Sequence, residues 1–191
     1  MTITGRQIAK GAGWMVLFKF TERGLGLIST LILARLLVPH DFGVVAMAMS
    51  VIAVLELMGA FSFDLALIQN ANAGRDQYDT AWTFNLLFAL VSALLLVVLA
   101  LPMAHFYSEP RLESVMYWLA LGMAVQGFEN VGVVAFRKDM RFDKEFKYLF
   151  GKKIASFAVT VPLAFMLQSY WALVIGTIVG RAAGTILSYV A

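Results

Sequence analysis

Six long apolar segments, separated by short polar breaks, fill almost the whole of this 191-residue chain. A helix that crosses a bilayer needs about 20 mostly apolar residues, and the segments are of that order of length. The predicted helices cover residues 13–38, 42–68, 81–106, 115–136, 154–170 and 171–191. The fifth contains Pro162 and has the shortest apolar core, but Lys152, Lys153 and Tyr170 flank it and suit the two membrane interfaces. The pattern predicts an all-α, polytopic membrane bundle of six transmembrane helices, one domain over residues 1–191.

The composition agrees with a lipid environment, because 61% of the residues are hydrophobic and only 14% are charged. The chain has no cysteine, which excludes a disulfide framework, thiol catalysis and thiolate metal sites. No nucleophile elbow, phosphate loop or cluster of metal ligands stands out, so we expect neither an enzyme nor a cofactor or metal. The first helix is too long for a signal-peptide core and is predicted to be a retained span.

Basic residues gather on one side of the membrane if the six helices alternate in direction. Arg6, Lys10, Arg75 and the basic segment 137–153 share that side, so the positive-inside rule predicts a cytoplasmic N-terminus. The net charge of +3 does not indicate nucleic acid, because the basic residues flank apolar segments. Segment 137–153 has the pattern of an amphipathic surface helix, whose basic side would meet anionic lipid headgroups or an anionic substrate. A loop that only fixes orientation is the simpler alternative.

Ionisable residues lie inside several of the predicted spans, where each costs about 2.5–3.5 kcal/mol if it faces lipid. They are Lys19, Glu22 and Arg23 in the first span, Glu56 and Asp64 in the second, Glu129 in the fourth and Arg181 in the sixth. In a functional interpretation, the three cations line a phosphate or pyrophosphate site, and Glu56 or Glu129 carries a coupling proton. In a structural interpretation, Glu22 neutralises Lys19 or Arg23, and the other glutamates meet the remaining cations.

Small and neutral polar residues inside the spans are expected to serve helix packing. Gly176, Gly180 and Gly184 are spaced by four residues, which puts them on one face of the sixth helix and allows a close approach of another helix. Interhelical hydrogen bonds are the expected role of Asn85, Gln126, Asn130 and Thr160.

Several short strings of residues resemble a known family. ARLLVPHDFG at 34–43, ALIQ at 66–69, FYSEP at 106–110 and WALV at 171–174 are similar, in order and spacing, to the oligosaccharide flippases of the multidrug/oligosaccharidyl-lipid/polysaccharide exporter superfamily. Its exopolysaccharide exporters are the most similar branch. The resemblance covers essentially the whole chain.

The resemblance implies a flippase that moves undecaprenyl-pyrophosphate-linked oligosaccharide units across the bacterial inner membrane by alternating access. Its members have two six-helix lobes, so this chain would be the N-terminal lobe and would need a second lobe or a parallel homodimer as partner. Arg23 and Lys19 are the first choices for contacting the pyrophosphate, and Asp64 has no assigned role. Two alternatives remain. The chain could be a lobe of a cation-coupled multidrug exporter, which would need an acidic cavity, or a non-transporting membrane scaffold subunit.

Overall fold

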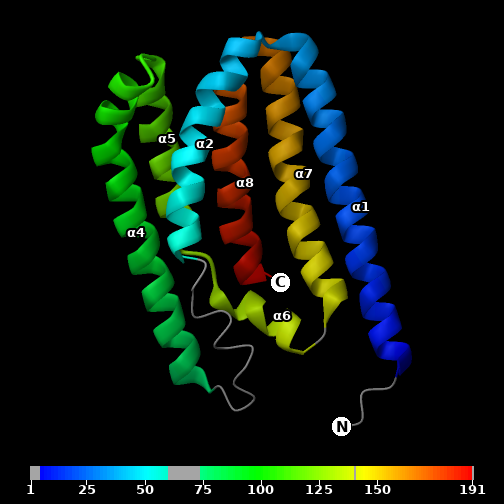
Figure 1. Cartoon of the computed structure of the whole chain (residues 1–191). Helices are drawn as coiled ribbons and strands as arrows, with labels where there is room; N and C mark the ends of the chain where they lie inside the picture. Colours follow the sequence, from blue (N-terminus) through cyan, green and yellow to red (C-terminus); the bar gives the residue numbers. More distant parts are fainter. Residues whose placement is uncertain (1–4, 60–73, 140, 191) are drawn as a thin grey trace.

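The computed structural model describes residues 5–59, 74–139 and 141–190. Within them the structure is helical and contains no strand. The elements are α1 Gly5–Leu36, α2 Pro39–Gly59, α4 Arg75–Phe106, α5 Arg111–Gln126, the 3₁₀ turn η1 Val131–Val133, α6 Val134–Lys138, α7 Phe142–Leu167 and α8 Trp171–Val190. The long helices run side by side and alternate in direction along the chain (Figure 1).

Four of the long helices, α2, α4, α7 and α8, are long and apolar enough to cross a membrane. Helix α5 has only 16 residues, and α1 carries Lys19, Glu22 and Arg23 along its 32 residues. The prediction of an all-helical, multi-pass membrane fold is confirmed. The count of six spans stays a prediction, although a helix lies in each of the six predicted regions.

The helices pack in a chain of neighbours in which α4 contacts α5, α5 contacts α8, α8 contacts α7 and α7 contacts α1. Helix α2 packs on α5 and α4. Fully buried apolar side chains fill the main core where α2, α4 and α5 meet, among them Ile52, Leu96, Leu112, Met116 and Leu119. Helix α8 therefore lies between the α4–α5 pair and the α7–α1 pair.

The glycines of α8 face α7, as their spacing predicts. A Cβ atom on Gly176 would lie within 3 Å of the Thr160 Cβ atom of α7, so a larger residue there would push the two helices apart. A Cβ atom on Gly184 would meet only the flexible end of the Lys152 side chain. The residues of α7 opposite Gly176, Gly180 and Gly184 are Thr160, Ser156 and Lys152, which are also spaced by four.

Two helix connections meet at one end of the bundle. Pro39 begins α2, a position that suits its fixed φ, and Asp41 lies buried in the first turn. In the link between α4 and α5, Ser108 adopts a left-handed backbone with φ 53°. His40 Nε2 lies 2.9 Å from Glu109 Oε2, so this contact ties the α1–α2 turn to the α4–α5 link.

The fourth helix ends earlier than predicted. Helix α5 stops at Gln126, ten residues before the expected end at 136. Asn130 then caps the short turn η1, because its Oδ1 accepts a hydrogen bond of 2.8 Å from the backbone N–H of Gly132. The third helix begins at Arg75 rather than at 81. The segment 60–73, which holds the expected end of the second helix, lies outside the described residues.

The basic segment 137–153 is not a separate surface helix in the structure. Helix α6 ends at Lys138, and α7 begins at Phe142 and continues without a break to Leu167. Most of the segment therefore forms the first turns of a membrane-length helix. The start of α4, helix α6 and the start of α7 lie at the same end of the bundle as the start of α1 (Figure 1), so the basic segments share one end, as alternation of the helices requires.

Candidate functional site

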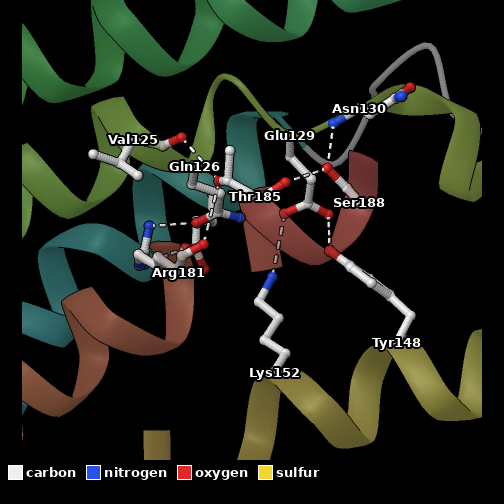
Figure 2. Close-up of polar contacts among 10 residues, drawn as sticks. Val125, Gln126, Glu129, Asn130, Tyr148, Lys152, Arg181, Thr185 and Ser188 are labelled. Carbon is white, nitrogen blue, oxygen red and sulfur yellow. Dashed lines mark hydrogen bonds and ion pairs between the residues drawn. The ribbon is translucent and has the colours of Figure 1, made fainter. Parts of the chain in front are cut away.

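Arg181 of α8 is the most deeply buried cation of the predicted site, with 11% of its side chain exposed. Its Nη1 donates a hydrogen bond of 2.6 Å to Oε1 of Gln126, the last residue of α5. Its Nη2 donates at 2.9 Å to Oε1 of Glu56 on α2 (Figure 2). A guanidinium stays charged in proteins, so the Glu56 carboxylate supplies the opposite charge that this burial requires.

Glu129 forms a second ionic group in the link that follows α5. Its Oε1 accepts a hydrogen bond from the Tyr148 hydroxyl, and its Oε2 lies 3.3 Å from the Lys152 ammonium. Tyr148 and Lys152 are one turn apart on α7, and Figure 2 shows both side chains reaching the same carboxylate. The contact joins the link after α5 to α7.

The polar face of α8 continues from Arg181 toward the C-terminus. Thr185 Oγ1 donates to the carbonyl oxygen of Val125 at 3.0 Å, in the last turn of α5. Ser188 Oγ accepts at 2.8 Å from the backbone N–H of Asn130. Helix ends leave backbone groups without intrahelical partners, and these side chains of α8 bind such groups where α5 ends (Figure 2).

A cavity of about 230 Å³ lies beside this cluster, between α2, α4, α5 and η1. Its polar lining residues are Glu56, Asn85, Gln126, Glu129 and Asn130. Each of the two carboxylates in the lining contacts a cation, so their negative charges are neutralised. The cavity is smaller than the about 300–1,000 Å³ of typical small-molecule sites, so a small polar group fits it and an oligosaccharide does not.

The predicted cations of α1 lie apart from this cluster. Lys19 Nζ is 3.6 Å from Glu22 Oε2, with side chains 68% and 37% exposed, and Arg23 is also exposed. Helix α1 packs on α7 and stands at the opposite edge of the bundle from α4 (Figure 1). The structure therefore brings together Arg181, Glu56 and, nearby, Glu129, but not Lys19 or Arg23. Asp64 lies outside the described residues.

Sequence reasoning missed Tyr148 and treated Lys152 only as a residue at the membrane interface. A signal was present, because Tyr148, Lys152, Ser156 and Thr160 recur every fourth residue and so share one face of α7. Within the described part of the chain, no group of three or more His, Asp or Glu side chains is placed to hold a metal ion.

Comparisons with known proteins give one family and several relatives. Succinoglycan biosynthesis transport protein ExoT of Rhizobium meliloti (strain 1021) is 27% identical over 172 residues, which are 90% of this chain and 35% of the relative. Lipopolysaccharide biosynthesis protein WzxC of Escherichia coli (strain K12) is 23% identical over 177 residues, 93% of this chain and 36% of the relative. A membrane protein in the cps region of Klebsiella pneumoniae is 23% identical over 187 residues, 95% of this chain and 38% of the relative.

The chain thus spans little more than a third of the length of the curated relatives it matches. No solved structure gives a significant match. The resemblance to polysaccharide exporters is confirmed by the relatives and by a family profile described as "Polysaccharide biosynthesis protein". Since that profile matches residues 32–191, most of the sequence, the chain belongs to the polysaccharide biosynthesis protein family.

Proposed function

We propose that this chain is the N-terminal lobe of a flippase that moves lipid-linked oligosaccharide units across the bacterial inner membrane by alternating access. Undecaprenyl pyrophosphate is the proposed carrier lipid, and all six long helices are proposed to span, with the N-terminus cytoplasmic. Family membership, relatives named for polysaccharide transport and biosynthesis, and the membrane-length helices support this proposal.

One observation carries the proposal: a buried guanidinium is held by a carboxylate that is itself half exposed. Arg181 is 11% exposed, whereas its partner Glu56 is 50% exposed and lines the cavity. A phosphate presents oxygens to a guanidinium in much the same geometry as a carboxylate does. A pyrophosphate that enters the cavity can therefore replace Glu56, while Gln126 keeps the guanidinium in position.

The same contact supplies a route for coupling. Protonation of Glu56 would remove the negative charge that competes with the phosphate for Arg181. A proton on Glu56 and the anionic headgroup at Arg181 would then both break the Arg181–Glu56 ion pair, which is how Glu56 would couple proton binding to substrate binding. Glu129 is the second proposed coupling residue, because its carboxylate also lines the cavity and is held by Lys152 across the bundle.

The charged face of α1 supports a partner for this lobe. Lys19 and Arg23 are exposed and Glu22 is partly exposed, and a charged side chain that faces lipid costs about 2.5–3.5 kcal/mol. A water-filled cavity shared with a second lobe, or with a parallel copy of this chain, would solvate them. In that arrangement Lys19 and Arg23 line the path of the headgroup.

A cation-coupled multidrug exporter is the second candidate, because Glu56 and Glu129 both line the cavity. An acidic cavity attracts cationic drugs. Here Arg181 and Lys152 neutralise the two carboxylates, which weakens that attraction and favours the flippase.

The test is polymer export in a bacterial strain that lacks its exopolysaccharide flippase and receives this chain or the longest reading frame that contains it, and the variants are made in the form that restores export. We expect Arg181→Ala to abolish export at normal membrane levels, and Arg181→Lys to restore only part of it, because an ammonium lacks the bidentate fork. Arg111→Ala, which changes the exposed first residue of α5, is the control and should export normally.

A double variant separates substrate binding from a merely structural ion pair. Replacing both members of a buried pair by apolar residues is often neutral for stability. If Arg181 only neutralises Glu56, Arg181→Met with Glu56→Met should restore export. We expect a stable protein without export, because the variant lacks both the proposed phosphate ligand and the proposed coupling carboxylate. Normal export by this double variant would refute both the role of Arg181 in substrate binding and the role of Glu56 in coupling.

A further inference from the structure

A second cavity, of about 410 Å³, lies where the start of α4, turn η1 and the end of α8 meet. Its lining residues are Arg75, Tyr78, Asp79, Trp82, Asn130, Val131, Gly132 and Tyr189. The volume falls in the range of about 300–1,000 Å³ that is typical of small-molecule sites. Asn130 and Val131 line this cavity and also the one beside Glu56, so the two cavities adjoin across η1.

Three aromatic residues give this cavity ring surfaces in fixed positions. Tyr78 and Trp82 lie one turn apart on α4 and pack against the buried cluster that contains Val131. Tyr189 of α8 donates its hydroxyl hydrogen to the carbonyl oxygen of Phe128 at 2.8 Å, which holds its ring beside the cavity. The faces of aromatic rings carry negative charge density and attract weakly positive C–H groups.

Polar groups complete the lining. The Arg75 Nε and an Asp79 carboxylate oxygen lie 3.8 Å apart on α4, and both side chains are exposed. The Asn130 side chain uses its oxygen to cap η1, and its amide nitrogen offers two donors. The cavity thus combines ring faces with a carboxylate acceptor, a guanidinium and an amide donor.

This combination of aromatic faces and polar groups suits a sugar ring. A sugar ring has an apolar C–H face, which suits an aromatic ring, and a rim of hydroxyl groups, which donate to carboxylates and accept from amides and guanidinium groups. Aromatic residues at membrane interfaces also serve as anchors, but that role requires neither a hollow nor polar groups around it.

We propose that this cavity binds a sugar residue of the oligosaccharide while the adjoining cavity near Arg181 receives the phosphate. This inference rests on the proposed function for the identity of the substrate. The sugar would lie against the rings of Tyr78, Trp82 and Tyr189, and its hydroxyl groups would bind Asp79 and Asn130.

The test is saturation-transfer NMR on the purified protein in detergent, with methyl α-D-glucoside and methyl β-D-galactoside as probes. We expect saturation of the sugar ring protons and a Kd on the order of 1 mM, as for a single ring held by few contacts. Trp82→Ala should weaken binding at least about tenfold, and Trp82→Phe should retain most of it because a ring remains. Trp118→Ala, which removes an exposed tryptophan of α5, is the matched control and should bind normally.

Two further experiments distinguish a sugar site from a lipid-headgroup site and from the flippase function itself. Glycerol 3-phosphate, the polar part of a lipid headgroup, should not displace the glycosides. The proposal is overturned if neither glycoside shows saturation transfer, if folded Trp82→Ala binds as well as the unchanged protein, or if glycerol 3-phosphate competes. Arg181→Ala should keep glycoside binding while losing export, so failure of the sugar site and failure of the flippase function give different results.

Discussion

Gly176 of α8 lies in a close contact between α8 and α7, so adding a single methyl group there tests the packing of the bundle. A Cβ atom at this position would be 2.9 Å from Thr160 Cβ and 3.3 Å from Thr160 Cα, and closer still to Thr160 Oγ1. Ordinary carbon contacts are about 3.5–4.0 Å. The Cβ and Cα of Thr160 cannot rotate away, so Gly176→Ala must push the two helices apart.

The expected cost follows from the contacts at this crossing. Overpacking of this kind costs about 1–3 kcal/mol. The hydrogen bond of 2.8 Å from Ser156 Oγ to the carbonyl oxygen of Gly176 would be strained or lost, which adds about 1 kcal/mol. Alanine regains about 1 kcal/mol of helix propensity over glycine. The net loss in the free energy of unfolding is therefore about 1–3 kcal/mol.

The assay is thermal unfolding of the detergent-purified protein. A chain of this size loses about 2–4 °C in Tm per kcal/mol, so we expect Gly176→Ala to unfold roughly 5 °C lower. Gly43→Ala is the control, because no heavy atom lies within 4 Å of a Cβ built there, and its Tm should not fall. Thr160→Ala in the Gly176→Ala background should recover part of the loss, since Oγ1 is removed and Cβ remains. Equal Tm values for Gly176→Ala and Gly43→Ala would refute the close crossing.

Two further substitutions test the polar contacts of the cluster. Lys152→Gln leaves the Glu129 carboxylate without its ammonium partner and should lower the free energy of unfolding by about 1–3 kcal/mol. A Tm equal to that of the unchanged protein would show that the Lys152–Glu129 pair contributes nothing to stability. Thr185→Val removes the hydroxyl donor to the Val125 carbonyl and should lower the free energy of unfolding by about 1 kcal/mol. The measurement is hydrogen exchange, which should become faster in the last turn of α5. Unchanged exchange there would contradict the capping role of Thr185.

The positions of the long helices could be predicted because the thickness of a bilayer fixes the length of an apolar run. The glycine-lined face of α8 could be predicted for a similar reason, since Gly176, Gly180 and Gly184 share a face by spacing alone. The early end of α5 could not be predicted from apolar length or from residue spacing. A mostly apolar stretch at 131–136 follows the polar residues Glu129 and Asn130, so hydropathy alone extends the span to residue 136. The helix ends at Gln126 because Asn130 caps a new turn and α8 binds the freed backbone groups.

The sequence suggested that Glu56 and Glu129 would pair with cations, but it could not identify the partner of each. Glu56 and Arg181 are 125 positions apart, and periodicity identifies the face of a helix on which a charge lies but not which helix it faces. The sequence pointed first to Lys19 and Arg23, with Arg181 as a further cation of the same site. Only the packing order of the helices separates Arg181, which lies beside the cavity, from the pair on α1, which lies across the bundle.

The two faces of α8 limit how this bundle can move. One face holds glycines against α7, and the other binds the end of α5 through Arg181, Thr185 and Ser188. Turning α8 about its axis would break both sets of contacts, so α5, α8 and α7 should move together as a rigid block. Any hinge within this bundle is then left to the outer helices. A movement of α2 away from the block would have to break the His40–Glu109 contact near the α1–α2 turn and the Arg181–Glu56 contact.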